Sequence, residues 1–363
     1  MIDCPKTVDV AVVGGGPAGA TIALLLARAG ISTLIVDASE RSTQRIGETI
    51  PPVANRLLRN LGLWSAFHKQ RHRRSEGTVS AWTDDHARVN DFFLGPQGAG
   101  WNLDRNRFDA MLLEESARAG SVVCKNARLV SCHRTNSRGW ALEFDRNDRR
   151  HKVRARYLVD ATGRLGTAPL TALGEKVALD RLIGAAKFFA AADASRYTLV
   201  EAVDDGWFYS ARLPQGRTVV AYFTDADIYS RRCKDDSGYW SAQLSKARHT
   251  RDRLGNAAVS GQPLIVSSAT VRRAEFSGTG WIAVGDAAQS FDPLSSLGIY
   301  KALDSAMRAC EFVVSALKKN RGDASYANWS EEVFHHYLQR RAEYYRSQRR
   351  WPGSVFWERR RVA

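Results

Sequence analysis

A glycine-rich loop near the start of the chain has the spacing of a phosphate-binding turn. Gly14, Gly16 and Gly19 form the pattern G-x-G-x-x-G, with Pro17 and Ala18 between the second and third glycines. The first glycine permits a tight turn, the second lets the backbone approach a pyrophosphate, and the third lets the following helix pack closely on its strand. The N-terminus of that helix offers free N–H groups and about half a positive charge to the phosphates. The loop therefore predicts dinucleotide binding.

Three aspartates that follow strand-like runs extend this signal. Asp37 ends the second apolar run, where its carboxylate is expected to accept hydrogen bonds from the adenosine ribose hydroxyls. Asp160 and Asp286 lie in the segments Asp-Ala-Thr-Gly and Gly-Asp-Ala-Ala, where a short carboxylate beside small residues can reach a ribose or ribityl hydroxyl. A lone G-x-G-x-x-G is a weak indication, but the three segments together, in this order, favour FAD.

Further residues of these segments are candidate contacts to the cofactor. Arg45 and Glu48, in the loop after the second predicted strand, are expected near the flavin, and Glu48 is also a candidate catalytic acid or base. Arg105 is a candidate for the phosphates, with a surface ion pair as the equal alternative. A helix N-terminus at Gly298 could stabilise negative charge on a reduced flavin ring. The full set of predicted cofactor contacts is Gly14, Gly16, Pro17, Ala18, Gly19, Asp37, Arg45, Glu48, Arg105, Asp160, Gly163, Gly285, Asp286, Pro293, Gly298 and Ile299.

Alternating strand and helix patterns must position these residues. A strand over 8–13, a helix over 17–29 that ends at Gly30, and a strand over 32–36 make a βαβ unit of a doubly wound parallel sheet. A helix is expected from Pro51 to Gly62 and another from Asp104 to Gly120. Short strands over about 122–159 lead back to that sheet. A strand over 281–284, a helix from Gly298 to Lys319 and one over about 323–350 complete the pattern.

A different pattern lies in the middle of the chain. Four β-rich runs, over 182–189, 197–203, 206–213 and 218–223, predict an antiparallel sheet, and residues 238–254 predict an amphipathic helix. The expected fold class is therefore α/β, with an antiparallel-sheet substrate domain inserted into a Rossmann-type FAD-binding domain. We assign residues 1–74, 104–175 and 271–322 to the FAD-binding domain, 75–103 and 176–270 to the substrate domain, and 323–363 to a C-terminal helical segment.

Composition narrows the class of protein. The net charge of +15 over 363 residues suits an anionic cofactor, and an acidic protein is a further candidate partner. The basic runs carry no recognisable nucleic-acid-binding module, so no nucleic-acid partner is predicted. The five cysteines are scattered, which favours reduced thiols and a cytoplasmic protein and gives no metal site. No apolar run approaches the roughly 20 residues of a membrane span.

Three longer segments carry a resemblance to a known superfamily. Residues 47–52 read Gly-Glu-Thr-Ile-Pro-Pro, residues 100–109 run from Gly-Trp-Asn-Leu-Asp to Arg-Asn-Arg-Phe-Asp, and residues 285–299 include Gly-Asp-Ala-Ala and Asp-Pro-Leu-Ser-Ser. With these motifs the chain resembles the flavoprotein monooxygenases that include aromatic hydroxylases and flavin-dependent tryptophan halogenases. It is most similar to the halogenase-like monooxygenases of quinone-cofactor biogenesis. The segment 351–360 near the end of this chain also resembles that subgroup. That resemblance implies hydroxylation of a tryptophan in a partner protein, on the way to cysteine tryptophylquinone.

Two departures separate the chain from the halogenases. The segment that matches their W-x-W-x-I-P motif reads Trp-Phe-Tyr-Ser-Ala-Arg-Leu-Pro over 207–214. The stretch that matches their essential lysine, around 76–79, contains none, and the nearby Lys69 lies in a basic run where it is expected to be solvated. Halogenation is therefore disfavoured.

The resemblance implies an FAD-dependent monooxygenase that hydroxylates an aromatic, indole-like substrate through the C4a-hydroperoxide of the reduced flavin. The substrate is a small aromatic molecule or a tryptophan of a protein or peptide, and NAD(P)H or a separate reductase supplies the electrons. Trp101, Phe188, Trp207 and Tyr209 are the predicted walls of the substrate pocket, although single aromatic residues in strands are more often core. Two alternatives stay open: a flavin-dependent reductase or dehydrogenase of an alkene or isoprenoid, and a non-catalytic flavin-binding partner protein.

Overall fold

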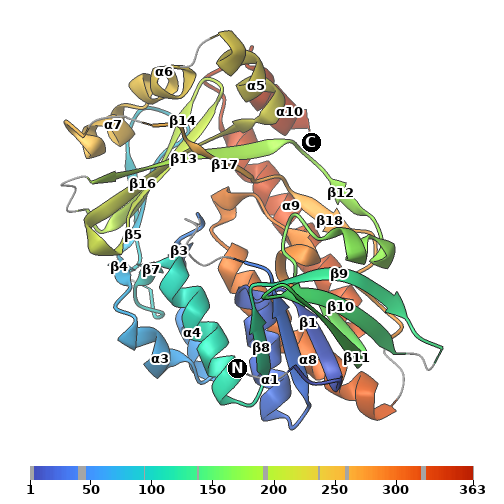
Figure 1. The fold of residues 1–363 in the computed structure, drawn as a ribbon. Coiled ribbons are helices and arrows are strands. Elements are labelled where there is room, and N and C mark those ends of the chain that lie inside the picture. The colour runs from blue at the N-terminus through green and yellow to red at the C-terminus, as the bar shows by residue number, and fades with distance from the viewer. Residues whose placement is uncertain are drawn as a thin grey trace.

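A parallel sheet forms the centre of the fold (Figure 1). The computed structural model describes residues 4–39, 46–93, 95–136, 139–190, 195–235, 238–257, 261–319 and 324–362. Its parallel strands lie in the order β20, β11, β1, β2, β8, and their bounds are β1 (Thr7–Val13), β2 (Thr33–Asp37), β8 (Val122–Lys125), β11 (Arg149–Asp160) and β20 (Trp281–Ala283). The buried apolar runs of β1 and β2 are typical of strands covered on both faces.

Antiparallel strands extend this sheet. The hairpin of β9 (Ala127–Arg134) and β10 (Trp140–Arg146) pairs with the first half of β11, and β19 (Ser277–Gly278) pairs with β20 at the other edge. The expected run of short strands before residue 159 is therefore confirmed, except that β8 belongs to the parallel part of the sheet.

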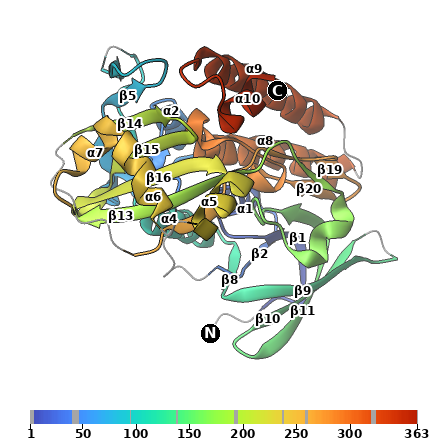
Figure 2. The same cartoon turned by 90° about the horizontal axis from the view of Figure 1, so that it is seen from above.

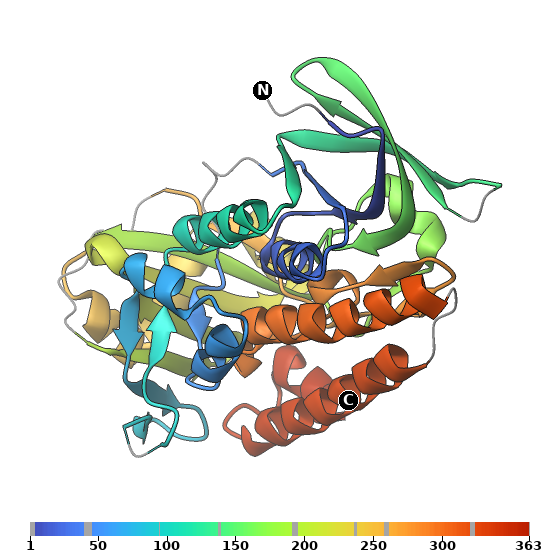
Figure 3. The same cartoon turned by 90° about the horizontal axis from the view of Figure 1, so that it is seen from below.

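Three helices pack together against the parallel sheet. They are α1 (Pro17–Arg28), α4 (Arg105–Arg118) and α8 (Gly298–Lys319), and Figure 3 shows α1 beside the long α8. The Asp104 side chain accepts a hydrogen bond from the backbone N–H of Arg107, which makes it the predicted N-cap of α4. Two short helices, α2 (Ala54–Asn60) and α3 (Trp64–Lys69), precede α4 in the chain.

A second, seven-stranded sheet lies beside the first (Figure 1). Its strands, in spatial order, are β17 (Leu264–Ser267), β13 (Leu182–Ala190), β16 (Arg217–Asp225), β15 (Gly206–Arg212), β14 (Tyr197–Val203), β5 (Gly77–Ala81) and β6 (Arg88–Asp91). All neighbours are antiparallel except β14 and β5, which are parallel and come from distant parts of the chain. The inserted antiparallel layer is therefore confirmed in its main part, while the domain boundaries stay predictions.

The two faces of this second sheet carry different side chains. Phe208 points to a cluster with Tyr222 and Trp240, under α5 (Ala226–Asp235), α6 (Tyr239–Lys246) and α7 (Arg248–Leu254). Trp207 and Tyr209 belong to the cluster on the opposite face. Figure 2 shows α5, α6 and α7 gathered along the sheet. The alternation along β15 is as period-2 strand geometry predicts.

The predicted helix over 238–254 is in fact two helices, which is a correction. Ala247 leaves the helical conformation between α6 and α7, with φ −88° and ψ 83°. The buried carboxylate of Glu201 accepts hydrogen bonds from the backbone N–H groups of His249 (3.0 Å) and Thr250 (2.7 Å). A carboxylate on the first N–H groups starts a new helix there, and no sequence pattern revealed that partner.

Two C-terminal helices close the open face of the second sheet. They are α9 (Ser325–Ser347), which runs alongside α8 in Figure 3, and α10 (Val355–Val362). Tyr345, Phe356 and Trp357 are fully buried against Trp207 and Trp82. The expected helix over 323–350 corresponds to α9, and α10 is an additional element.

Small sheets connect these layers. One has the order β3 (Thr49–Ile50), β7 (Gly100–Asn102), β4 (Arg73–Ser75), and another has the order β12 (Lys176–Ala178), β18 (Val271–Arg273), β21 (Gln289–Ser290). Among the described residues, every helix is too short or too polar to cross a bilayer.

A buried ion pair anchors the C-terminal segment, and it yields a stability prediction. Arg360 and Asp225 are almost fully buried, and Nη2 lies 2.6 Å from Oδ1. Because Arg360→Met leaves the Asp225 carboxylate buried with the half-exposed Arg359 as its remaining cation, we expect the free energy of unfolding to fall by roughly 3 kcal/mol. Urea unfolding measures this. The exposed Arg340→Met is the control and should change the free energy of unfolding by less than about 0.5 kcal/mol. Equal changes in the two variants would contradict the role of the Arg360–Asp225 pair as an anchor.

Candidate functional site

The three predicted cofactor segments meet at the carboxyl ends of adjacent strands. Val13 of β1 pairs with Asp160 of β11, and Asp160 pairs with Ala283 of β20. A Cβ on Gly14 would lie 2.2 Å from the carbonyl oxygen of Ala161. The register therefore brings residues 14–19, 160–163 and 285–286, far apart in sequence, to one edge, where open α/β sheets bind their ligands.

The glycines of this edge fall into two groups. Gly14, Gly19 and Gly285 are required by packing, since an added Cβ would lie 2.2, 1.9 and 2.7 Å from neighbouring atoms. In contrast, an added Cβ at Gly16, Gly163 or Gly298 has no atom of the described part of the chain within 4 Å. These three open positions lie at the start of α1, after β11 and at the start of α8. At Gly163 the φ of +74° already favours glycine, whereas at Gly16 and Gly298 a ligand that approaches the backbone would account for glycine where packing does not require it.

The N-terminus of α1 has the features of a phosphate site. Gly16 is its N-cap without a side-chain hydrogen bond, Pro17 occupies the first turn, and no acidic residue lies in that turn. Ala18 is buried and meets Gly285. Asp37 ends β2 beside the loop, and its carboxylate accepts a hydrogen bond from the backbone N–H of Gly15 at 3.1 Å. The predicted ribose-binding carboxylate of Asp37 thus also holds the conformation of the glycine loop.

Asp286 is held between two cations and stays one-third exposed. Lys301 Nζ lies 2.9 Å from Oδ1, and Arg164 Nη2 lies 3.6 Å from Oδ2. Burial acts to raise the pKa of Asp286, but the charges of Lys301 and Arg164 outweigh it and hold the pKa below its ordinary value. The carboxylate is therefore ionised and oriented, with part of its surface free to accept a hydrogen bond.

Asp160 has a different environment from the one expected. Its side chain is fully buried, forms an ion pair with Arg273, and accepts hydrogen bonds from the backbone N–H and hydroxyl of Thr162. Since those partners take up the carboxylate, Asp160 supports the end of β11 and offers no group to a ligand in this conformation. Gly163, just beyond it, has φ +74° and an open Cβ position.

The loop before β3 carries Glu48, and Arg105 holds this loop in place. Arg105 donates to the carbonyl oxygens of Ile46 and Gly47, both at 3.0 Å, and pairs with the buried Asp109 at 3.2 Å. The structure thus gives Arg105 a role in loop anchoring, with most of its donors occupied. Arg45 lies outside the described residues.

Glu48 is a buried carboxyl with an unsatisfied oxygen. The residue is 3% exposed, Oε2 accepts a hydrogen bond from Gly47, and Oε1 has no partner among the residues that the structure describes. Burial raises the pKa of Glu48 to about 7, against the opposing charge of Arg105. A carboxyl that titrates near neutrality can both give and take a proton.

Tyr209 and Phe188 lie on the sheet face near this loop. The Tyr209 hydroxyl forms a hydrogen bond with Thr49, the residue after Glu48, and burial raises the Tyr209 pKa far above its ordinary value. Phe188, Tyr209, Ile46 and Leu294 all pack against one apolar cluster. The structure therefore brings Tyr209 next to the loop of Glu48 and places Phe188 against the same apolar cluster as Tyr209 and Leu294.

The other two predicted pocket residues lie elsewhere. Trp207 is 1% exposed, stacks on Phe223 at 4.1 Å between ring centroids, and donates to the hydroxyl of Tyr345, so it fills the core under α9. Trp101 packs edge-on against Phe67 and donates to Asn55, because it faces the opposite side of β7 from its neighbour Asn102. The predictions for these two residues are not supported.

The loop between β21 and α8 is fixed by α9. Tyr345 donates to Asp292 at 2.7 Å, and the backbone N–H of Asp292 donates to the Tyr337 hydroxyl at 2.8 Å. Pro293 begins a 3-10 turn, and Ile299 is buried in the first turn of α8. The helix N-terminus at Gly298 is thus held rigidly at the same edge as the glycine loop.

Three residues that hold the site were missed from sequence. Lys301 fixes Asp286, Arg273 neutralises Asp160, and Asn102 bridges the Thr49 hydroxyl to the carbonyl of Arg212. Lys301 alone had a signal in the sequence, since this lysine follows Gly298 by about one turn among the apolar residues Ile299, Ala302 and Leu303.

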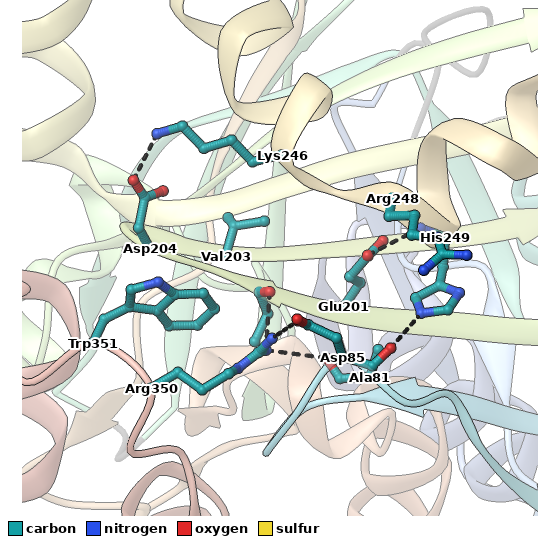
Figure 4. A pocket seen from close by; sticks show the side chains of 11 residues that line it. Ala81, Asp85, Glu201, Val203, Asp204, Lys246, Arg248, His249, Arg350 and Trp351 are labelled. Atoms are coloured by element: carbon teal, nitrogen blue, oxygen red, sulfur yellow. Dashed lines mark hydrogen bonds and ion pairs between the residues drawn. The ribbon is translucent and has the colours of Figure 1, made fainter.

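A pocket of about 260 Å³ lies at another place, between β14, α6, α7 and residues 350–351 (Figure 4). Its charged groups are paired with one another: Arg350 with Asp85 at 2.5 Å, and Lys246 with Asp204 at 2.6 Å. Glu201 caps α7 from the pocket wall. Because these charges satisfy each other, the pocket lacks the convergent polar groups of a binding site, and we assign it no ligand.

The residues of the sheet edge fit FAD. The open glycine positions, the uncapped start of α1, the oriented Asp286 and the orphaned Oε1 of Glu48 are features of a site built for an extended dinucleotide that ends in a polar ring.

Comparison with known proteins agrees with this geometry. The chain is 30% identical to a protein described as the FAD-dependent oxidoreductase LodB of Marinomonas mediterranea, over 98% of this chain and 97% of LodB. Among solved structures it is similar to the peptidyl tryptophan dihydroxylase QhpG, which is essential for tryptophylquinone cofactor biogenesis, with 25% identity, a TM-score of 0.73, and 98% and 78% of the two chains covered. It also matches the flavin-dependent halogenase CmlS, with 24% identity, a TM-score of 0.89, and 99% and 68% covered.

A protein-family model described as "FAD binding domain" matches residues 7–339. The match includes all three segments of the sheet edge and the inserted antiparallel layer. The chain therefore belongs to this FAD-binding-domain family and is a halogenase-like, FAD-dependent oxidoreductase.

Proposed function

We propose that this enzyme is a monooxygenase that hydroxylates an aromatic ring, with a tryptophan of a protein or peptide as the favoured substrate. The observation that supports it is the position of Tyr209, which lies beside Glu48 and forms a hydrogen bond with Thr49. Tyr209, Phe188 and Leu294 of the loop before α8 pack against one apolar cluster, and burial raises the pKa of Glu48 to about 7. The similarity to QhpG supports the tryptophan assignment, because that protein acts on a peptidyl tryptophan.

The chain's own residues would bind and orient the cofactor. The start of α1 would hold the pyrophosphate, Asp37 the adenosine ribose and Asp286 a hydroxyl of the ribityl chain, while the start of α8 would face the ring. Reduced FAD would supply two electrons that activate O₂, so that one oxygen atom of O₂ goes to the aromatic ring and the other leaves as water. Phe188 and Tyr209 would then position the aromatic ring and exclude water.

Glu48 is our candidate for the proton step. When oxygen adds to an aromatic carbon, that carbon must lose its proton to restore the ring, and an ionised Glu48 could accept it. Thr49, held by Tyr209 and Asn102, keeps the loop that carries this carboxyl in place.

Mass spectrometry tests the proposed reaction. The FAD-loaded protein, O₂, NADH or NADPH and a tryptophan-containing peptide should give a peptide with one or more added oxygen atoms, together with O₂ consumption. Reduction of an alkene without O₂ consumption would favour the dehydrogenase alternative. Flavin binding without turnover under any reductant would favour the non-catalytic one.

Gly16→Val tests the placement of the pyrophosphate. Because no atom lies within 4 Å of the added Cβ, the chain should fold normally, yet FAD affinity should fall by at least about a hundredfold. Fluorescence titration with FAD and thermal unfolding of the apoprotein measure the two effects. Gly14→Val is the contrasting variant, since its Cβ overlaps Ala161 and should destabilise the apoprotein itself. Wild-type FAD affinity in Gly16→Val would contradict the assignment.

Glu48 gives a pH prediction for stability. Its pKa in the folded chain, about 7, is above the usual carboxyl value, so the folded state binds the proton more tightly than the unfolded state. Stability therefore falls as pH rises from about 4.5 to about 7. Glu48→Gln should remove this component and unfold at a higher temperature than wild type at pH 8, with little difference at pH 5. The same difference at both pH values would show that Glu48 does not titrate in this window.

Glu48→Gln also tests the proton step. We expect wild-type hydroxylation to increase with pH through about 7 and the variant to lose this dependence, with a rate lower by about 10²–10⁴. FAD absorbance serves as the control for cofactor binding. An unchanged pH profile in the variant would assign the proton to another group.

Halogenation is the competing activity, because a solved structure of similar fold is a halogenase. The stretch around 76–79 has no lysine, and Lys301 is engaged by Asp286 and the carbonyl of Gln289. Turnover in chloride or bromide should therefore yield hydroxylated and no halogenated tryptophan by mass spectrometry. A halogenated product would overturn this assignment.

A further inference from the structure

One stretch of the chain next to Glu48 is basic and contains no acidic residue. Between Thr49 and Ser75 there is no aspartate or glutamate. The same stretch carries six lysine or arginine residues, namely Arg56, Arg59, Lys69, Arg71, Arg73 and Arg74. We call the surface formed by this stretch the basic face; it comprises α2, α3 and β4.

The cations of the basic face are available to a partner. Arg56, Arg59, Lys69, Arg71 and Arg74 are exposed. Within the part of the chain that the structure describes, none of these five forms an ion pair, and Arg59 lies over the ring of Trp64 at 4.1 Å. The acidic residues at its border are already engaged: Asp104 caps α4, and Glu76 pairs with Arg196 at 2.6 Å. Exposed like charges that are close together in the chain and have no ion-pair partner attract a molecule of opposite charge.

The basic face adjoins the candidate active site. Thr49 of β3 pairs with Asn102 of β7, and Asn102 pairs with Arg73 of β4. Two strand spacings, about 10 Å, therefore separate the residue after Glu48 from the edge of the basic face. Figure 1 shows β3, β7, β4 and α3 grouped together on one side of the molecule. A polypeptide bound on this face would thus have its neighbouring residues within reach of Glu48.

We propose that the basic face is the docking surface for an acidic polypeptide, which presents its aromatic residue to the site beside Glu48. The inference rests on the proposed function and names the chemistry of the partner. An oligonucleotide fits this face less well, because the aromatic rings there are not free to stack on bases: Trp101 packs edge-on with Phe67 at 5.3 Å and with Trp64 at 6.3 Å. Helices α2 and α3, of seven and six residues, are also too short to fill a groove.

Binding of a charged probe tests the proposal. The probe is a fluorescein-labelled oligoglutamate peptide with one tryptophan, titrated by fluorescence anisotropy into the FAD-loaded full chain. The triple variant Arg56→Glu/Arg71→Glu/Arg74→Glu should bind it about tenfold more weakly at low ionic strength. The matched control, Arg128→Glu/Arg149→Glu/Arg154→Glu, makes the same change of charge on exposed residues of β9 and β11 and should stay within about twofold of wild type.

Turnover adds a readout that separates docking from chemistry. The basic-face variant should raise KM for the acidic peptide about tenfold and leave kcat and the turnover of free tryptophan unchanged. Equal weakening in both triple variants would overturn the proposal, as would an oligonucleotide that binds the face and is not displaced by the peptide. If the probe binds as expected but no tryptophan is oxidised, the proposed function fails and the docking surface remains.

Discussion

The close approach of three backbones at one sheet edge is the constraint on which the rest of the structure depends. Gly14 lies against the carbonyl of Ala161, Gly19 lies against Gly14, and Gly285 lies against Ala18. A side chain at Gly14 would separate the ends of β1 and β11, and one at Gly19 or Gly285 would push α1 away from this edge. Once the strand ends meet, α1 and α8 both begin at that edge, so two positive helix ends converge on one place. The site therefore follows directly from the close packing of backbone at this edge of the sheet.

Two aspartates complete this edge, and cationic side chains of the same chain stabilise their negative charges. Asp160 is fully buried and would be unstable as an isolated carboxylate, but Arg273 reaches it from β18. Asp286, by contrast, keeps one-third of its side chain exposed between Lys301 and Arg164. Two aspartates in similar sequence contexts thus differ in function, since one supports a strand end and the other can receive a ligand.

The C-terminal helices link the cofactor edge to the second sheet. Tyr345 lies at the centre of this link: it donates to Asp292 in the loop before α8 and accepts from Trp207 on the sheet face. Through these contacts α9 sets the position of the helix end at Gly298 relative to Phe188 and Tyr209. The same contacts of Tyr345 would position an aromatic substrate on the sheet face against the flavin ring of FAD. This suits a reaction that depends on precise orientation.

The sequence by itself determined the local features. It predicted the glycine loop, the strand ends at Asp37 and Asp160, the N-cap at Asp104, the alternation along β15 and the inserted sheet, because each depends mainly on residues close in the chain. Only the tertiary structure decided which candidates share a site. Arg273 takes Asp160, the C-terminal helices bury Trp207, Glu201 divides a predicted helix at Ala247, and Trp101 faces α2 and α3. Those outcomes depend on partners as many as 138 residues away in sequence, and side-chain burial, which sets the pKa of Glu48, exists only once the layers have packed.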